Sequence, residues 1–273
     1  MCFPTIPYLI KLYRCFLQRF HKAFRTAAFS LCLLDLLALL PTAFPSHRYI
    51  EDKVLPKYTD YSVVMQRWMG IFLIVAFVFL GYLLSQTLRD CYQDSHAIYT
   101  FLSLPCPALA LPLAWAALFF TAVCMLVILQ LCLVIVFYPV FLLCRCIDVL
   151  HFQAKINAGK VILVSSDPET LPQVFQASRF LQALLPLQLV KVPLWLSNLL
   201  LPVSGAAACL CCRRWKGNLF TFTVIIICLK MNYNSIFSDV NHRLICYSSI
   251  ALFCEILLLL FAFYTIYHRN NLP

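Results

Sequence analysis

The sequence predicts an all-α fold, a polytopic transmembrane helical bundle of about six spans that begins with an N-terminal interfacial amphipathic helix. Hydrophobic residues make up 63% of the 273 residues and charged residues only 12%, about half the charged share of an ordinary soluble domain. Uncharged stretches long enough to form membrane helices also recur along the chain, whereas a membrane β-barrel shows short alternating segments. These two observations argue against a soluble enzyme, a coiled coil and a disordered chain.

Residues 1–26 are expected to form a basic amphipathic helix in the membrane interface. Apolar side chains recur there at three- and four-residue spacing, and basic ones occupy the other face, among them Lys11, Arg14, Lys22 and Arg25. A basic face opposite an aromatic one is typical of a helix that lies in the interface. An ordinary basic cytoplasmic tail is the alternative, and no cleavable signal peptide is expected.

Residues 27–273 are expected to form a single transmembrane domain. A helix needs about 20 apolar residues to cross the hydrocarbon core. This requirement places the spans at residues 27–45, 68–88, 109–138, 193–212, 217–237 and 244–267. The fifth span reaches this length only when the apolar stretch 219–229 is extended past Lys230, so five spans is the alternative.

The third span differs from the others because no charge interrupts residues 109–144. It is expected to be one long helix that tilts or extends beyond the bilayer, with a bend at Pro139. The more polar stretch 145–179 contains Asn157-Ala158-Gly159 and Ser165-Ser166-Asp167-Pro168, which are turn signals. It is expected to be a loop with short helices. Small residues from Ser204 to Ala208 would let a neighbouring helix approach the fourth span closely.

The net charge of +10 fits a membrane protein better than a nucleic-acid-binding protein. No soluble module carries a basic patch interleaved with stacking aromatic residues, so no nucleic-acid partner is expected. Basic residues instead gather in the N-terminal segment and at Arg213, Arg214 and Lys216. Because basic residues favour the cytoplasmic side, we expect a multi-pass protein of the cell membrane with both termini in the cytoplasm.

Catalytic and metal-binding motifs are not found in the sequence. Gly159-Lys160 is followed by Val161, and position 154 is alanine, so the chain has no phosphate-binding loop for ATP. G-x-S-x-G and H-E-x-x-H are also missing. The 15 cysteines mostly lie in apolar runs, where a thiol behaves as a small hydrophobic group. No C-x2-C pair among them is matched by a second pair at zinc-site spacing. We therefore expect neither an enzyme nor a metal site nor a cofactor held by this chain.

Two carboxylates, Asp35 and Glu255, fall inside expected spans. A charge in the bilayer is costly, so each should face the bundle interior, a wet cavity or a cation. One interpretation is a substrate pathway, or an ion pair with Lys230 or Lys191. The other is a protonated or hydrated acid that contributes to helix packing.

The connection between the second and third spans carries a short amphipathic segment. Ile98, Phe101, Leu102 and Pro105 form its apolar face, and Arg89, Asp90, Asp94 and His96 stay polar. Such a segment, held between two membrane helices, suits docking on a soluble partner. A plain interfacial connector is the alternative.

In its order of features, the chain resembles the membrane subunit of bacterial ABC transporters of the exporter type. The connection reads Tyr99-Thr100-Phe101-Leu102-Ser103-Leu104-Pro105, similar to a "Y-T-x-L-x-L-P" phrase of those permeases. Before the fourth span, residues 180–186 read F-L-Q-A-L-L-P, similar to a second phrase. A basic first helix, a long third span and a short basic tail after the last span complete the resemblance.

This resemblance implies a permease subunit that moves a substrate with energy from a separate ATPase, which holds ATP and Mg²⁺. Its partners would be that ATP-binding cassette subunit, a second permease subunit, identical or related, and the lipid bilayer. The connection would be the coupling helix, with Asp90, Asp94, Tyr99, Leu102 and Pro105 as contacts to the ATPase. Cys106 follows the phrase where the family often has a basic residue.

Two other functions stay open on the residues alone. An integral membrane enzyme acting on lipid would need a polar site near the interface, for which Asp90, Asp94 and His96 are the compact candidate. A membrane assembly protein without transport activity would share the same fold.

Overall fold

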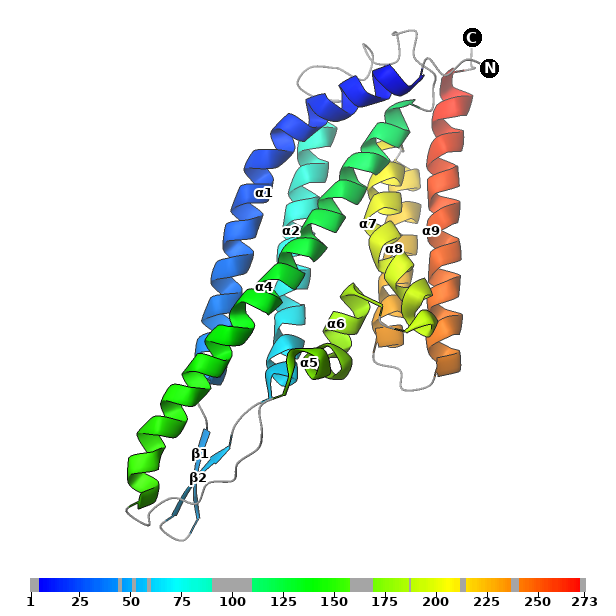
Figure 1. Cartoon of the computed structure of the whole chain (residues 1–273). Coiled ribbons are helices and arrows are strands. Elements are labelled where there is room, and N and C mark those ends of the chain that lie inside the picture. Colours follow the sequence, from blue (N-terminus) through cyan, green and yellow to red (C-terminus); the bar gives the residue numbers. More distant parts are fainter. Residues whose placement is uncertain are drawn as a thin grey trace. The chain divides into compact units, whose positions relative to one another are not determined.

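The structure is a computed structural model of the whole chain. It describes residues 5–43, 46–50, 53–57, 60–89, 110–157, 169–186, 188–211, 215–236 and 241–270. Helices dominate the described residues (Figure 1).

Five long helices confirm the prediction of a helical, multi-pass membrane protein. They are α1 (Thr5–Ala43), α2 (Tyr61–Arg89), α4 (Ala110–Asn157), α7 (Val192–Cys211) and α9 (Asn241–Asn270). The segments long and apolar enough to cross a membrane are Phe20–Leu40, Tyr61–Arg89, Leu113–Ile147, Leu189–Leu210 and Arg243–Thr265. A sixth helix, α8 (Trp215–Ile236), coincides with the expected fifth span, but its apolar part Phe220–Ile236 is shorter.

Helix α1 joins two elements that the sequence was expected to separate. The basic segment and the first span form one helix of 39 residues, rather than an interfacial helix and a distinct span. No glycine or proline lies between Arg25 and Ala28 to stop the helix. Thr26 adapts to the helical backbone by donating its hydroxyl hydrogen bond to the carbonyl of Ala23, at 2.8 Å.

Helix α4 runs 48 residues and contains Pro139, so residues 145–157 are helical and not part of a loop. At a rise of about 1.5 Å per residue this helix is roughly 72 Å long, more than twice the hydrocarbon core. The expectation of a third helix that extends beyond the bilayer thus agrees with its length. The helix ends at Asn157, where the Asn-Ala-Gly turn signal begins.

Short elements connect the long helices. Strands β1 (Ser46–Ile50) and β2 (Lys53–Lys57) form an antiparallel hairpin in which Ser46 pairs with Lys57 and Ile50 with Lys53. No element was expected from the sequence at residues 46–57. Helices α5 (Leu171–Ala177) and α6 (Arg179–Leu184) and the 3₁₀ turn η2 (Leu189–Lys191) lead into α7.

The chain divides into two compact units. The first contains Met1–Ala27, Ala76–Leu126 and Ala183–Pro273, and the second contains Ala28–Val75 and Val127–Gln182. Within the first unit, α7, α8 and α9 pack against one another, and Figure 1 shows them side by side. Within the second unit, the later part of α1, the first part of α2, the later part of α4 and the segment of α5 and α6 provide buried residues.

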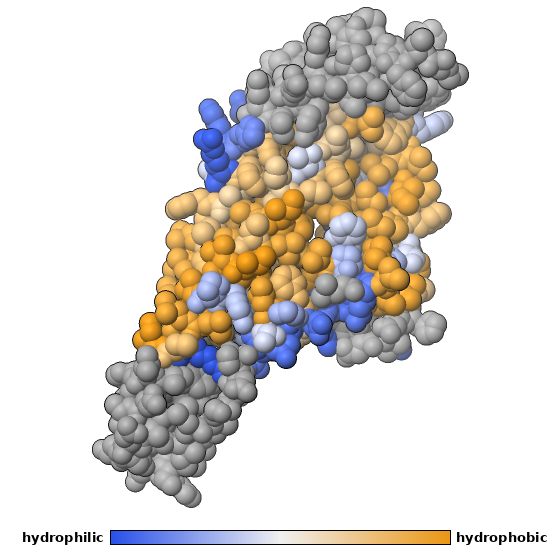
Figure 2. Space-filling model, in the orientation of Figure 1, coloured by the Kyte–Doolittle hydropathy of each residue, from blue (hydrophilic) through white to orange (hydrophobic). Residues whose placement is uncertain are grey.

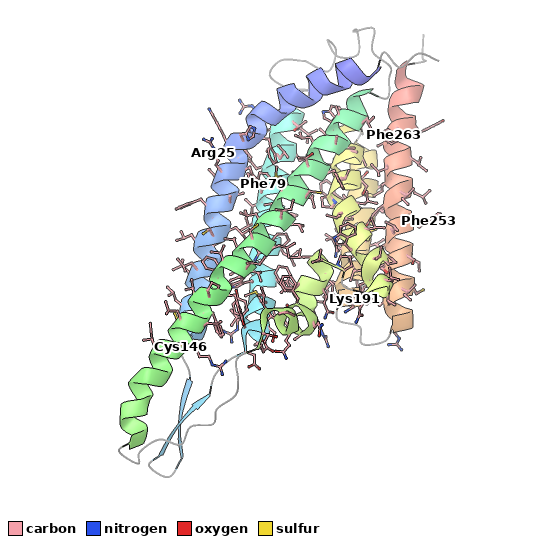
Figure 3. All side chains as sticks on the ribbon, in the orientation of Figure 1. Arg25, Phe79, Cys146, Lys191, Phe253 and Phe263 are labelled. Atoms are coloured by element: carbon pink, nitrogen blue, oxygen red, sulfur yellow. The ribbon has the colours of Figure 1, made fainter. Side chains whose placement is uncertain are left out.

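In α9 the distribution of polarity is the reverse of that in a helix of a soluble bundle. The buried stripe of α9 recurs every three or four residues and consists mainly of small or polar side chains: Leu244, Ser248, Ala251, Glu255, Leu258 and Ala262. Bulky hydrophobic residues point outward instead, such as Phe253, which Figure 3 shows directed away from the bundle. The visible face of the described helices is largely hydrophobic (Figure 2). This distribution suits lipid outside and close helix packing inside.

Small residues set the contact between α7 and α8. Ser204 through Ala208 are all buried, and a Cβ atom added at Gly205 would lie 2.8 Å from Cδ1 of Ile225. The close approach expected from the small residues is therefore made by α8. Nine cysteines whose side chains the structure describes are free thiols: Cys32, Cys124, Cys132, Cys144, Cys146, Cys209, Cys228, Cys246 and Cys254.

Candidate functional site

In the second unit, Asp35 of α1 meets Gln130 of α4. Both side chains are fully buried, and Gln130 Nε2 donates a hydrogen bond to Asp35 Oδ2 at 3.0 Å. The remaining oxygens, Asp35 Oδ1 and Gln130 Oε1, are buried without a hydrogen-bond partner. Gln130 lies at the midpoint of the apolar segment Leu113–Ile147. Two unpaired acceptors therefore lie deep in a transmembrane part of the protein.

The positions of Asp35 and Gln130 on the buried faces of their helices explain why the two side chains are in contact. Asp35 follows Ala27 and Leu31 at four-residue intervals on the buried side of α1. Gln130 lies on the buried side of α4 between Leu126 and Val134. Residues at such spacing share one face of a helix, so the same periodicity that buries the apolar residues also directs both polar side chains inward.

In the first unit, three helices bring Ser197 of α7, Asn232 of α8 and Glu255 of α9 together. At most 3% of each side chain is exposed. Ser197 Oγ donates to Glu255 Oε1 at 2.6 Å, and Asn232 Nδ2 donates to Ser197 Oγ at 2.8 Å. We call these three residues the polar triad.

Ser197 Oγ also lies 3.0 Å from Asn232 Oδ1, but a hydroxyl has only one proton, and the shorter distance of 2.6 Å assigns that proton to Glu255 Oε1. An amide donates to a hydroxyl, and that hydroxyl donates its single proton to a carboxylate oxygen. Ser197 is the central member, because it alone contacts both other side chains in this chain of bonds. Glu255 Oε2 is buried and has no partner. The arrangement holds one carboxylate oxygen and leaves the other available to a proton or another donor.

A third polar contact joins the start of α2 to the segment before α5. Glu169 accepts two hydrogen bonds from Ser62, from the backbone N–H to Oε2 and from the hydroxyl to Oε1, both at 3.0 Å. The Tyr138 hydroxyl donates to the carbonyl oxygen of Glu169 at 2.7 Å. A carboxylate at the first turn of a helix meets unpaired N–H groups and the positive end of the helix dipole. Glu169 therefore anchors its segment to α2 and α4.

Aromatic packing surrounds that contact. The Tyr61 hydroxyl donates to the carbonyl oxygen of Val134 at 2.9 Å. The ring of Tyr61 lies 5.4 Å from that of Tyr138 and 5.0 Å from that of Phe141, measured between centroids. Edge-to-face and tilted pairs at such distances are favourable. They hold the start of α2 against the part of α4 that follows Gln130 in the sequence.

The structure places both carboxylates predicted from the sequence, each in its own unit. Asp35 and Glu255 are fully buried, as expected of acids inside membrane spans. Their hydrogen-bond partners are a neutral amide and a neutral hydroxyl. Lys230 is exposed on α8, whereas Asn232 is the α8 member of the triad. An ion pair with Lys191, in η2, stays a prediction.

The other predicted site residues lie outside the described part of the chain. These are the coupling-loop residues Asp90, Asp94, Tyr99, Leu102 and Pro105, all in the connection between α2 and α4. Among the residues that the structure describes, no three His, Cys, Asp or Glu side chains form a group able to hold a metal ion.

Sequence reasoning missed Gln130, Ser197 and Asn232 as partners of the two acids. Gln130 carried a usable signal, because it is a lone amide within the uncharged stretch 109–144. Ser197 and Asn232 carried none, since serine and asparagine also lie at neighbouring positions such as Asn198 and Asn234. Only the packing of three helices selects which of them faces Glu255.

Comparisons with protein-family models, with curated proteins and with solved structures find no match to this chain.

Proposed function

We propose that this chain is the permease subunit of an ATP-driven ABC transporter of the exporter type, which moves a substrate across the cell membrane. The observation that carries the proposal is the order of the helices. A helix with a basic first part (α1) precedes α2, the connection with the Tyr99–Pro105 phrase and the 48-residue α4. The Phe180–Pro186 phrase then begins in α6, before η2 and α7. The resemblance implies this same order.

An even number of crossings supports a cytoplasmic position for the connection between α2 and α4. Helix α8 has 22 residues, about 33 Å at 1.5 Å per residue, which is enough for the hydrocarbon core of about 30 Å. Short connections, residues 212–214 and 237–240, join α8 to α7 and α9, against which it packs. With α8 as a sixth span, both termini and residues 90–109 fall on one side. The basic residues of α1 and of 213–216 favour the cytoplasm for that side.

Energy for transport enters through the partner ATPase in this mechanism. ATP, held with Mg²⁺ by that subunit, draws a pair of ATPase subunits together. The connection 90–109 is covalently continuous with α2 and α4, so its displacement is transmitted to two spans. Transport follows because the two conformations of the bundle differ in their affinity for nucleotide on the partner. A second permease subunit, identical or related, completes the pathway.

Affinity purification of the tagged full chain from its native membranes tests this proposal. We expect an ATPase with a phosphate-binding loop to co-purify and to hydrolyse ATP, with inhibition by vanadate, after reconstitution into lipid nanodiscs. Leu102→Asp places a charge on the apolar face of the connection and should remove the ATPase. Ser103→Asp adds the same charge at the adjacent position and is the matched control.

Two outcomes would contradict the proposal. The first is a chain that purifies intact and folded without any ATP-hydrolysing partner. The second is lipid turnover by the chain alone that depends on His96, which would instead indicate a membrane enzyme. Equal retention of the ATPase by Leu102→Asp and by Ser103→Asp would contradict the assigned docking surface.

A further inference from the structure

We propose that Asp35 binds a proton inside the membrane and shares it with Gln130, so that the contact between α1 and α4 depends on protonation. This inference is independent of the proposed transport function, because it concerns only side chains of the second unit. The ligand is the proton itself, and the site consists of one carboxyl group and one amide group.

The hydrogen-bond inventory of the pair carries the inference. The carboxyl group and the amide are both fully buried, and one N–H of Gln130 already reaches Asp35 Oδ2 at 3.0 Å. What remains is one oxygen on each partner, Asp35 Oδ1 and Gln130 Oε1, and neither has a partner. An ionised aspartate has only hydrogen-bond acceptors, so it cannot donate a hydrogen bond to the amide oxygen of Gln130. Two unpaired acceptors in one buried pair indicate a missing donor.

A single proton on Asp35 supplies that donor. A protonated carboxyl group has one O–H donor and keeps one acceptor oxygen. Its O–H can then donate to Gln130 Oε1, while Oδ2 continues to accept from Gln130 Nε2. A carboxylic acid and a primary amide match donor for acceptor in this way, and both orphaned oxygens are satisfied together. No cavity for a larger ligand is required.

The electrostatics of the second unit also favour the neutral acid. A carboxylate removed from water with one neutral hydrogen bond is costly, and an acid in a membrane span avoids the cost by neutralising. The titratable groups that face this region are Tyr61 on α2 and Tyr138 on α4, whose hydroxyls donate to backbone carbonyls. Glu169 accepts two hydrogen bonds from Ser62. None of these supplies a positive charge.

The buried arginine of α4 in this unit lies far from the pair. Arg145 is buried on the same helix, but 15 residues beyond Gln130 it is displaced along the axis by about 22 Å at 1.5 Å per residue. Its charge therefore does not replace the proton. Loss of the proton would leave a charge and an unpaired amide oxygen between α1 and α4, so water must enter there or the helices must separate.

Infrared spectroscopy of the protein in lipid nanodiscs tests the inference. Aspartate labelled with ¹³C at the side-chain carboxyl shifts the carbonyl band of a protonated aspartic acid away from that of glutamic acid. We expect one such band at neutral pH, shifted by the label in the wild-type protein and lost in Asp35→Asn. Gln130→Leu should keep the band but move it to higher frequency, because the hydrogen bonds to the amide are lost.

Glu255→Gln is the matched control, since it neutralises the other buried acid and should leave the aspartate band unchanged. The wild-type spectrum alone suffices to refute the inference, even where a variant fails to fold. A folded protein without a protonated aspartate band at neutral pH would overturn it, and an ionised Asp35 whose spectrum changes with Na⁺ would assign a cation instead. A band that Asp35→Asn leaves in place would overturn the assignment to this residue.

Discussion

Ser197→Ala is the sharpest test of the polar triad. The hydroxyl of Ser197 accepts from Asn232 and donates to Glu255, so its removal breaks both bonds and leaves the two partner groups buried. Because the three residues lie on three helices, the loss falls on the packing of the whole α7–α8–α9 group. The alanine variant retains the backbone and nearly the same volume, so little else changes.

The expected magnitude follows from the number of bonds lost. A hydrogen bond between transmembrane helices contributes about 0.6 kcal/mol on average and about 1–2 kcal/mol in model peptides. Two bonds therefore sum to about 1–4 kcal/mol on the same scale. The unpaired buried groups left behind add to this cost, by about 1–3 kcal/mol for a protein interior. We expect the free energy of unfolding to fall by about 2 kcal/mol or more.

Titration with SDS of the protein in mixed micelles, followed by circular dichroism, measures this change. Ser204→Ala is the control, because Ser204 is equally buried on α7 but donates only to the carbonyl of Leu201 in its own helix. Its effect should be clearly smaller than that of Ser197→Ala, because a serine hydroxyl bonded to its own helix backbone adds little to helix stability. If Ser197→Ala and Ser204→Ala destabilise equally, the triad does not hold the helices together and the reasoning fails.

Three further variants test other contacts by the same unfolding assay. Gly205→Leu should destabilise the protein by about 1–3 kcal/mol, because the leucine side chain would overlap α8. Gly81→Leu should be nearly neutral, because no atom lies within 4 Å of a Cβ added at Gly81. Equal effects of the two variants would contradict the contact between Gly205 and α8. Glu169→Ala should lower the free energy of unfolding by about 1–2 kcal/mol, because the first turn of α2 loses its two hydrogen bonds to the carboxylate. An unchanged free energy of unfolding would show that these bonds do not stabilise the protein. Tyr61→Phe should lower the free energy of unfolding by about 0.5–1.5 kcal/mol, because the hydrogen bond to α4 is lost. Tyr82→Phe is its control, because Tyr82 is exposed and its replacement should leave the stability unchanged.

The positions of the membrane helices were largely predictable from the sequence, because the apolar length needed for a span is a local property. The expected spans at 193–212 and 244–267 coincide closely with α7 and α9. The ends of the helices were less predictable. The polar residues 145–157 continue α4 as a helix, since polarity alone does not break a helix and the turn signal comes only at Asn157.

The candidate site was only half predictable. Asp35 and Glu255 were identified because an acid in an apolar run is conspicuous and costly. Their partners depend on which helices pack together and in what register, which is not encoded by any single segment. The hairpin of β1 and β2 likewise has no sequence signal, because the strands SHRYI and KVLPK do not alternate apolar and polar residues. Pro56 within β2 also argues against a strand.

Deletion of residues 94–105 from the full chain tests the central claim, coupling to an ATPase, most directly. The measurement is ATP hydrolysis by the complex purified with the deleted chain in lipid nanodiscs, compared with the complete chain at equal membrane insertion. Because α2 and α4 lie outside the deletion, we predict unchanged insertion and unfolding by SDS but loss of the ATPase subunit and its activity. Full ATPase activity and retention of the partner by the deleted chain would contradict the account.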